Sequence, residues 1–195
     1  MDHLFNSIEE KYYENTSELD VSNKKLYKLN DLSRFKNLKI LNCYNNNLSS
    51  LDHLPSTIEY IDCSFNNLKN LNNLPFNLKT LICYYNNFDY LDNLPINLEY
   101  LDCSRNTIKE LNYLPINLKT LYCECNDLTS LENLPLNLET LNCSYNKIVS
   151  LENLPNNLKK LHCNHNILTE LLNLPSHLEI LTCDFNKCRI TTKIK

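Results

Sequence analysis

Residues 98–117 read LEYLDCSRNTIKELNYLPIN, and stretches of 20 residues with the same pattern follow one another along the chain. The shared pattern is L-x-x-L-x-C-x-x-N-x-I-x-x-L-x-x-L-P-x-N, and its first leucine marks the start of each copy. A period this regular predicts one structural unit repeated many times, so we expect a stack of coils rather than a globule. Eight such copies begin at Leu38, Ile58, Leu78, Leu98, Leu118, Leu138, Leu158 and Leu178, and a looser copy of 22 residues (16–37) precedes them.

The L-x-C segment of each copy has the inward–outward alternation of a short strand. In the copy at 98–117, Leu101 and Cys103 are expected to point into the core. Tyr100, Asp102 and Ser104 are expected to point outward. Equivalent strands of successive copies would then lie side by side in one parallel sheet.

An asparagine follows each of these cysteines by three residues, at a position where the chain has to turn. A buried amide side chain has to be hydrogen-bonded. One asparagine per turn can bridge backbone groups of adjacent coils, so the sequence predicts a continuous asparagine ladder. Its members are Asn46, Asn66, Asn86, Asn106, Asn126, Asn146, Asn166 and Asn186.

A leucine–proline step, such as Leu114-Pro115, closes the apolar pattern of each regular copy before the last. Proline disfavours helix in the residue before it. Because 20 residues leave little room for a helix, we expect the return path of each coil to be extended or short 3₁₀ structure.

The chain contains no glycine. This excludes the glycine-dependent sites: the P-loop, the dinucleotide-binding fingerprint and the G-x-S-x-G nucleophile elbow. Tight turns are therefore expected to be made by Asn, Asp and Pro, of which Asn tolerates left-handed conformations best.

Charge and hydropathy narrow the partners and the compartment. A formal net charge of −4 argues against nucleic acid as the partner, and the absence of any apolar run of 18 residues argues against a membrane span. Residues 1–15 are charged and lack the apolar core of an export signal. We therefore expect a cytoplasmic protein with reduced thiols.

The repeated pattern resembles the leucine-rich repeat family, L-x-x-L-x-L-x-x-N-x-L, with cysteine in the third apolar position. Its short L-P-x-N-L form is similar to the 20-residue repeats of bacterial effectors. Its many asparagines and its regularly spaced cysteines are similar to those of leucine-rich repeat proteins of large DNA viruses of amoebae. The resemblance implies an α/β repeat solenoid, mostly β, that is curved, with a parallel sheet on its concave face. It also implies protein binding on that face and, for a viral protein, a location in the host cytoplasm.

Two parts of the chain are expected. Residues 1–15 form an N-terminal helical cap, because Leu4, Ile8 and Tyr12 recur at helical spacing. Residues 16–195 form the solenoid of about nine repeats, the first atypical and the last truncated. In the first repeat Lys24 stands where the ladder asparagine is expected.

The eight periodic cysteines are interpreted as small apolar groups of the core. A zinc site needs ligands that converge on one point, whereas the side chains of a parallel ladder do not converge. Disulfides between neighbouring coils would have poor side-chain direction. We therefore predict no metal and no cofactor. Cys188 takes the place of an apolar residue and is also assigned to the core.

Two features keep an enzyme or a metal protein open as minor alternatives. Cys125 occupies a rim position, one coil from Arg105, which would lower its pKa. His162 and His165 lie three residues apart, with Asp184 on the next coil as the nearest further ligand. No residue completes either site in the sequence, so no catalytic residue is assigned and the protein is predicted not to be an enzyme.

The outward positions of the middle strands combine tyrosines with acidic residues. Tyrosine offers a large contact area with few rotatable bonds and is enriched at protein interfaces. We therefore hypothesise a protein-interaction scaffold whose partner has a basic surface, and the oligomeric state stays open. The resemblance to bacterial effectors implies an alternative, a substrate-recruiting adaptor or decoy for host ubiquitin or immune signalling. The predicted contact residues are Tyr60, Asp62, Tyr84, Tyr100, Asp102, Tyr122 and Glu124.

The residue after the first leucine of each copy alternates in charge without a break. In an in-register stack, such neighbours lie about 4.8 Å apart. The alternation therefore predicts a column of ion pairs that favours register and solubility. The column reads Lys39, Glu59, Lys79, Glu99, Lys119, Glu139, Lys159 and Glu179.

Overall fold

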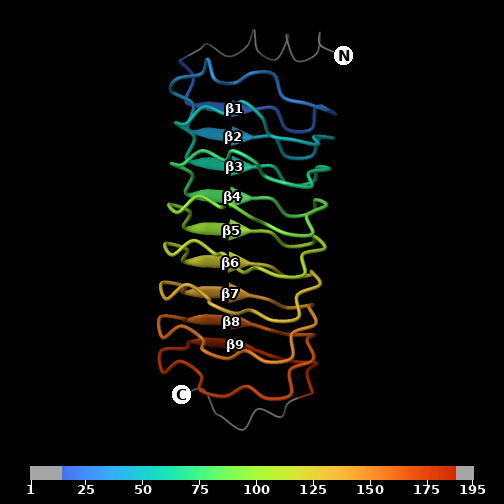
Figure 1. Cartoon of the computed structure of the whole chain (residues 1–195), viewed down its shortest axis with the longest axis vertical. Coiled ribbons are helices and arrows are strands. Elements are labelled where there is room, and N and C mark those ends of the chain that lie inside the picture. The colour runs from blue at the N-terminus through green and yellow to red at the C-terminus, as the bar shows by residue number, and fades with distance from the viewer. Residues whose placement is uncertain (1–14, 188–195) are drawn as a thin grey trace.

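The structure is a computed structural model that describes residues 15–187. The predicted helical cap at 1–15, apart from Asn15, and Cys188 lie outside these residues. Nine short parallel strands stack in chain order into one sheet along the long axis of the molecule (Figure 1). They are β1 (Glu18–Asp20), β2 (Ile40–Asn42), β3 (Tyr60–Asp62), β4 (Thr80–Ile82), β5 (Tyr100–Asp102), β6 (Thr120–Tyr122), β7 (Thr140–Asn142), β8 (Lys160–His162) and β9 (Ile180–Thr182).

The register places the same repeat position of each coil beside its counterpart. Leu101 of β5, for example, pairs with Leu81 of β4 and with Leu121 of β6. A column of equivalent residues therefore runs along the whole stack, which confirms the predicted repeat architecture.

No helix of any kind occurs between residues 15 and 187, and hence none of membrane-spanning length. The return path of each coil is extended, with a tight turn after the proline in which Leu98 N donates to Pro95 O at 3.0 Å. The predicted class is thus confirmed in its β part and in its extended return path, whereas the 3₁₀ alternative is not adopted in this part of the chain.

The core is a set of columns of Leu, Ile and Cys that run along the stack between the sheet and the return path. Seven of the eight periodic cysteines have no exposed surface, and Cys183 is 7% exposed. All eight are reduced thiols. The assignment of these cysteines to the core is confirmed.

The asparagine ladder forms as predicted. Asn106 Nδ2 donates to the carbonyl oxygens of Cys103 (3.0 Å) and of Cys83 on the preceding coil (3.3 Å). Its Oδ1 accepts from the backbone N–H of Phe88 at 3.2 Å. In the first repeat, Lys24 takes the ladder position. Its backbone N–H and that of Leu26 donate to Asn46 Oδ1 on the next coil. Each ladder asparagine thus satisfies backbone groups of two coils, which would otherwise be buried without partners.

A second asparagine column, which sequence analysis missed, ties the return paths together. In the P-x-N step, Asn117 Nδ2 donates to the carbonyl of Ile96 at 3.0 Å, and Asn137 Nδ2 to that of Ile116 at 3.2 Å. The remaining members of this return-path ladder are Asn77, Asn97 and Asn157. Both edges of the coils between Ser56 and Asn157 are therefore held to the neighbouring coil by side-chain amides.

The turns correct one expectation. Apart from Lys25, the left-handed residues form two columns, and Asn predominates in only one of them, at Asn73, Asn93, Asn133, Asn153 and Asn173, with His53. The other column directly precedes the ladder positions and consists of Asn23, Asn45, Phe65, Tyr85, Arg105, Cys125, Tyr145, His165 and Phe185.

Two kinds of contact offset the cost of a left-handed conformation at these bulky residues, which is about 1–2 kcal/mol each. The backbone N–H of Tyr85 donates to Ser104 O of the next coil at 3.0 Å, and the same bond recurs along the column. Neighbouring rings also stack, as in Tyr145–His165 and His165–Phe185, with centroids 4.2 Å apart in both pairs. Such ring pairs contribute about 0.5–1.5 kcal/mol.

The alternating charge column forms ion pairs at the edge where the strands begin. Glu59 lies between Lys39 (2.9 Å) and Lys79 (2.7 Å). Glu99 pairs with Lys119, and Glu139 with Lys159, each at 2.7 Å. The predicted pairing is confirmed for these residues, and the two lysines lower the pKa of Glu59 to about 2.

Candidate functional site

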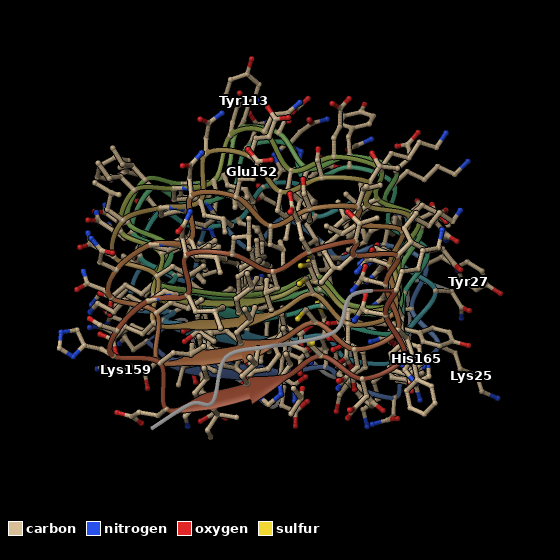
Figure 2. The ribbon with its side chains drawn as sticks, turned by 90° about the horizontal axis from the view of Figure 1, so that it is seen from below. Lys25, Tyr27, Tyr113, Glu152, Lys159 and His165 are labelled. Atoms are coloured by element: carbon tan, nitrogen blue, oxygen red, sulfur yellow. The ribbon has the colours of Figure 1, made fainter. Side chains whose placement is uncertain are left out.

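The seven predicted contact residues lie together on the outward side of β3–β6, which we call the sheet face. Figure 2 looks along the stack and shows the strands on the side opposite Tyr113 and Glu152. Asp62, Ile82, Asp102 and Tyr122 are register neighbours on successive strands. Each of the seven is half-buried, so each offers part of its surface to solvent while its backbone is fixed by the sheet.

Aromatic residues form two clusters on this face. Tyr100 and Tyr122 come from adjacent strands, and their ring centroids lie 5.8 Å apart. Nearer the N-terminus, Phe65 packs edge-on against Tyr84 (5.2 Å). It also packs edge-on against Tyr44 (5.4 Å) and stacks on Tyr85 (4.5 Å).

The second cluster joins the sheet face to the rim, a connection absent from the predicted contact set. Phe65 and Tyr85 belong to the left-handed column, whereas Tyr84 follows a strand. Their left-handed backbone turns these rings toward the tyrosines of the sheet face. The aromatic surface is therefore wider than the seven predicted residues.

The serines of the sheet face are buried, which corrects the expectation that this position points outward. Ser104 was expected to point outward, but it is only 5% exposed, and its equivalents Ser64 and Ser144 are 0% and 4% exposed. They alternate along the stack with larger residues, such as Tyr44 and Tyr84 on the coils either side of Ser64. The larger side chains cover the serines, and Ser64 Oγ has no hydrogen-bond partner among residues 15–187.

Three carboxylates lie among these aromatic rings. Asp62 and Asp102 each accept a hydrogen bond of 3.0 Å from the backbone N–H two residues later. Glu124 accepts a hydrogen bond from Asn142. Burial raises the pKa of Asp102, and the charges of Glu124 and Asp62 raise it further.

The carboxylates have no cationic counterpart on the sheet face. The outward positions from Tyr60 to Ser144 include no Lys, Arg or His. Burial, followed by the charge of Asp102, raises the pKa of Tyr100 to about 12, so this phenol stays neutral. The surface is thus aromatic, acidic and rigid.

Cys125 does not have the electrostatics of a nucleophile. Burial raises its pKa and outweighs the opposing effect of Arg105, contrary to the expectation of a lowered value. Burial also raises the pKa of the six ladder thiols from Cys43 to Cys143, and that of Cys143 reaches about 12. Since the thiolate is the reactive form, the raised pKa lowers the reactivity of these cysteines at neutral pH.

The two histidines are engaged in the packing of the stack. His165 is stacked between Tyr145 and Phe185. His162 Nδ1 lies 3.0 Å from Thr182 Oγ1. Within residues 15–187, no three His, Cys, Asp or Glu side chains are grouped to hold a metal ion.

Solved structures with the same fold include those of bacterial proteins. The effector YopM from Yersinia pestis, described as leucine-rich, has a TM-score of 0.84 and 34% identity over 88% of this chain and 48% of its own. The leucine-rich repeat domain of a Shigella effector has a TM-score of 0.72 and 27% identity over 96% and 77%, respectively. The functional domain of InlJ from Listeria monocytogenes, described as including a cysteine ladder, has a TM-score of 0.77 and 32% identity over 88% and 40%.

The chain therefore spans about half the length of YopM and less of InlJ. No protein-family model matches it, and neither does any curated protein sequence. The likeness rests on the fold, the 20-residue period and the shared residues, and the similarity to proteins of amoeba viruses stays a prediction.

Proposed function

Because the chain is a leucine-rich repeat protein of the short, 20-residue type, we propose that it is a non-enzymatic scaffold that binds a partner protein on its sheet face. The contact residues are those of the middle coils. Reduced thiols suit a reducing compartment, so the cytoplasm is the proposed location.

One observation carries this proposal: Tyr100, Tyr122 and Asp102 form a half-buried group on adjacent strands of a rigid sheet. Rigid aromatic side chains lose little conformational entropy when a partner covers them. The sheet itself needs no rearrangement, since its backbone is fixed by the pairing of the strands and by the ladder through Asn106 and its equivalents.

Charge defines the partner. Three carboxylates without a counter-ion favour a protein that presents Lys or Arg to Asp62, Asp102 and Glu124. A bound cation stabilises the ionised form of Asp102, whose pKa is raised in the unbound protein. Binding is therefore expected to weaken as the pH falls through that raised pKa, because the neutral carboxyl no longer attracts the cation.

A photo-cross-linking amino acid at position 122 tests the location of the interface in the native cell. It should capture a protein that the same amino acid at exposed Tyr27, far from the sheet face, does not capture. The affinity of the captured protein is then measured with Tyr100→Ala and Tyr122→Ala, each expected to weaken binding about 10-fold or more. Unchanged affinity in both variants would reject the sheet face as the site.

Asp102→Asn separates an interface role from a structural one. The amide keeps the acceptor for the Ser104 N–H but removes a charge that burial disfavours. The folded protein should become more stable by about 0.5–1 kcal/mol at neutral pH, while partner affinity falls. A residue that served the fold alone would lose stability on substitution.

A substrate-recruiting adaptor or decoy for host ubiquitin or immune signalling is the second candidate. The observation that favours it is the likeness to two proteins described as effectors. The identity of the cross-linked protein distinguishes it from a general scaffold: a ubiquitin-pathway or immune-signalling protein supports the candidate, and any other protein contradicts it.

A further inference from the structure

Four large apolar side chains are exposed in a row, each in the turn that leads from the proline of the return path to the next strand. They occupy the x of the P-x-N step in four successive coils. Polar Ser56 and Asn156 take this position on the coils before and after, so the row has definite ends. The four are Phe76, Ile96, Ile116 and Leu136, with exposed fractions of 65%, 52%, 61% and 74%, and we call them the apolar row.

The apolar row is held in place by the return-path ladder. The backbone carbonyl of each of its members accepts a hydrogen bond from the P-x-N asparagine of the following coil, at 3.0–3.2 Å. Coils are about 4.8 Å apart, so the row is about 15 Å long. Contiguous exposed apolar patches commonly mark interaction sites. A preformed patch also loses little conformational entropy when a partner covers it.

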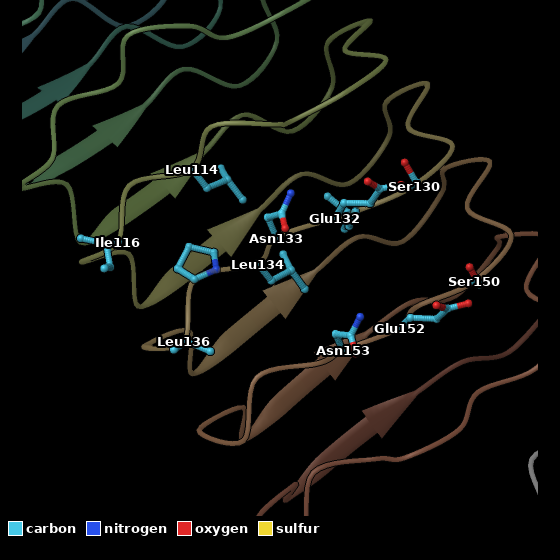
Figure 3. Close-up of a pocket in the computed structure, with 12 residues that line it drawn as sticks. Leu114, Ile116, Ser130, Glu132, Asn133, Leu134, Leu136, Ser150, Glu152 and Asn153 are labelled. Atoms are coloured by element: carbon cyan, nitrogen blue, oxygen red, sulfur yellow. The ribbon is translucent and has the colours of Figure 1, made fainter.

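An open hollow of about 690 Å³ adjoins the C-terminal half of the row. Figure 3 shows the side chains of Leu114, Ile116, Leu134 and Leu136 toward one end of it and those of Glu132 and Glu152 toward the other. Both glutamates are exposed, and the residues that line the hollow include no Lys, Arg or His. Apolar contact and negative charge are therefore offered side by side.

We propose that the apolar row and this hollow together bind a basic amphipathic helix of a partner protein. A helix rises 1.5 Å per residue, so residues three apart rise about 4.5 Å and match the spacing of the coils. About ten residues cover the row, with their apolar stripe on Ile116 and Leu136. A Lys or Arg on the flank of that stripe reaches Glu132 and Glu152, with its aliphatic stem over the leucines.

Charge disfavours a second copy of this chain as the occupant. Apposed hollows of two copies would bring Glu132 and Glu152 of one copy against the same residues of the other, and like charges across an interface are costly. The surface is also separate from the sheet face, so this inference holds or fails independently of the proposed function.

The test uses a register series of 14-residue helical peptides with leucines at i, i+3 and i+7 and lysines along one flank. Peptides of the same composition in scrambled order, and with glutamate for lysine, are the controls. Binding to the whole chain is measured by fluorescence anisotropy. We expect binding by at least one register, loss of binding by both controls, and weaker binding at high salt, since exposed charges are screened.

The chain supplies its own matched variant, because Asn156 already occupies the position of the apolar row on the next coil. Ile116→Asn/Leu136→Asn should therefore fold, and it is expected to weaken the peptide about 10-fold or more. Glu132→Gln/Glu152→Gln should weaken it by a similar factor, whereas Tyr100→Ala/Tyr122→Ala on the sheet face should leave it unchanged. If no register binds, or if binding survives both return-path variants, the proposal is wrong. Self-association that Ile116→Asn/Leu136→Asn abolishes would assign the surface to a second copy and also overturn it.

Discussion

The interior of the stack repeats the same residues in every coil, whereas its outer surfaces change from coil to coil. Asparagine fills one interior column eight times, and cysteine fills another eight times. On the sheet face, Tyr, Thr, Asp and Ile succeed one another, and on the return path an apolar row begins and ends within four coils. The residues that hold the fold together are therefore repeated in every coil, whereas the residues available to bind a partner differ from coil to coil.

Substitution in an interior column should have the largest effect on stability. Asn106→Ala removes the donor for two buried carbonyls and the acceptor for Phe88 N–H. Leaving such groups unpaired should lower the free energy of unfolding by about 3–4 kcal/mol, measured by urea titration. Asn72→Ala, on the exposed return path, should change it by less than about 0.5 kcal/mol. Similar costs for the two variants would contradict the division between interior and surface.

The second prediction compares buried and partly exposed cysteines by the rates at which their thiols are labelled. In a Cys188→Ser background, the eight ladder cysteines should react at least about 100-fold more slowly in the native protein than in urea, because they react only after local unfolding. Partly exposed Cys125 should be labelled first. Mass spectrometry of the time course identifies the sites, and equal native and unfolded rates for the ladder would show that these thiols do not lie in the core.

A smaller effect distinguishes two positions of the same outer column. Asn133 is left-handed with φ 56°, whereas Tyr113, at the same position of the preceding coil, is absent from the left-handed set. Asn133→Val should cost about 1–2 kcal/mol, since a β-branched residue fits the left-handed region poorly. Tyr113→Val should cost less than about 0.5 kcal/mol, because that side chain is 78% exposed. Equal thermal stability of the two variants would argue against the difference in backbone conformation.

The exposed ion pairs should give the smallest effect. The pKa of Glu59 is lowered from its ordinary value of 4.5 to about 2 by Lys79 and Lys39. Its contribution to stability is therefore full above pH 4.5 and is lost as the pH falls toward 2. Glu59→Gln should remove this part of the acid dependence in melting curves, and the difference from the unaltered chain should shrink at 1 M salt. A difference that grew with salt would contradict the pairing.

The repeated features of the fold could be predicted because every coil states them again. The strand register, the burial of Cys103 and its equivalents, and the ladder through Asn106 all follow from one pattern. The left-handed conformation of the column before the ladder asparagines could not be predicted from the sequence, because Phe65, Arg105 and Cys125 are not residue types that mark such turns. Its one signal was position, directly before each ladder asparagine.

The surfaces were less predictable, for a related reason. Alternation along a strand gives the direction of a side chain but not whether larger neighbours cover it, so the burial of Ser64 was missed. The apolar row was missed because an x position between proline and asparagine is typical of a loop. The signal was present in the sequence: Phe76, Ile96, Ile116 and Leu136 succeed one another there.

The alternating charges also constrain how such an array can gain or lose length. Excising one coil, residues 98–117, would set Lys79 against Lys119, and Tyr84 against Glu124 instead of a serine. Excising two, residues 98–137, would set Lys79 against Glu139 and Tyr84 against Ser144, as neighbours of the same kind stand now. Duplications and deletions that keep opposite charges beside each other are therefore those that add or remove coils in even numbers.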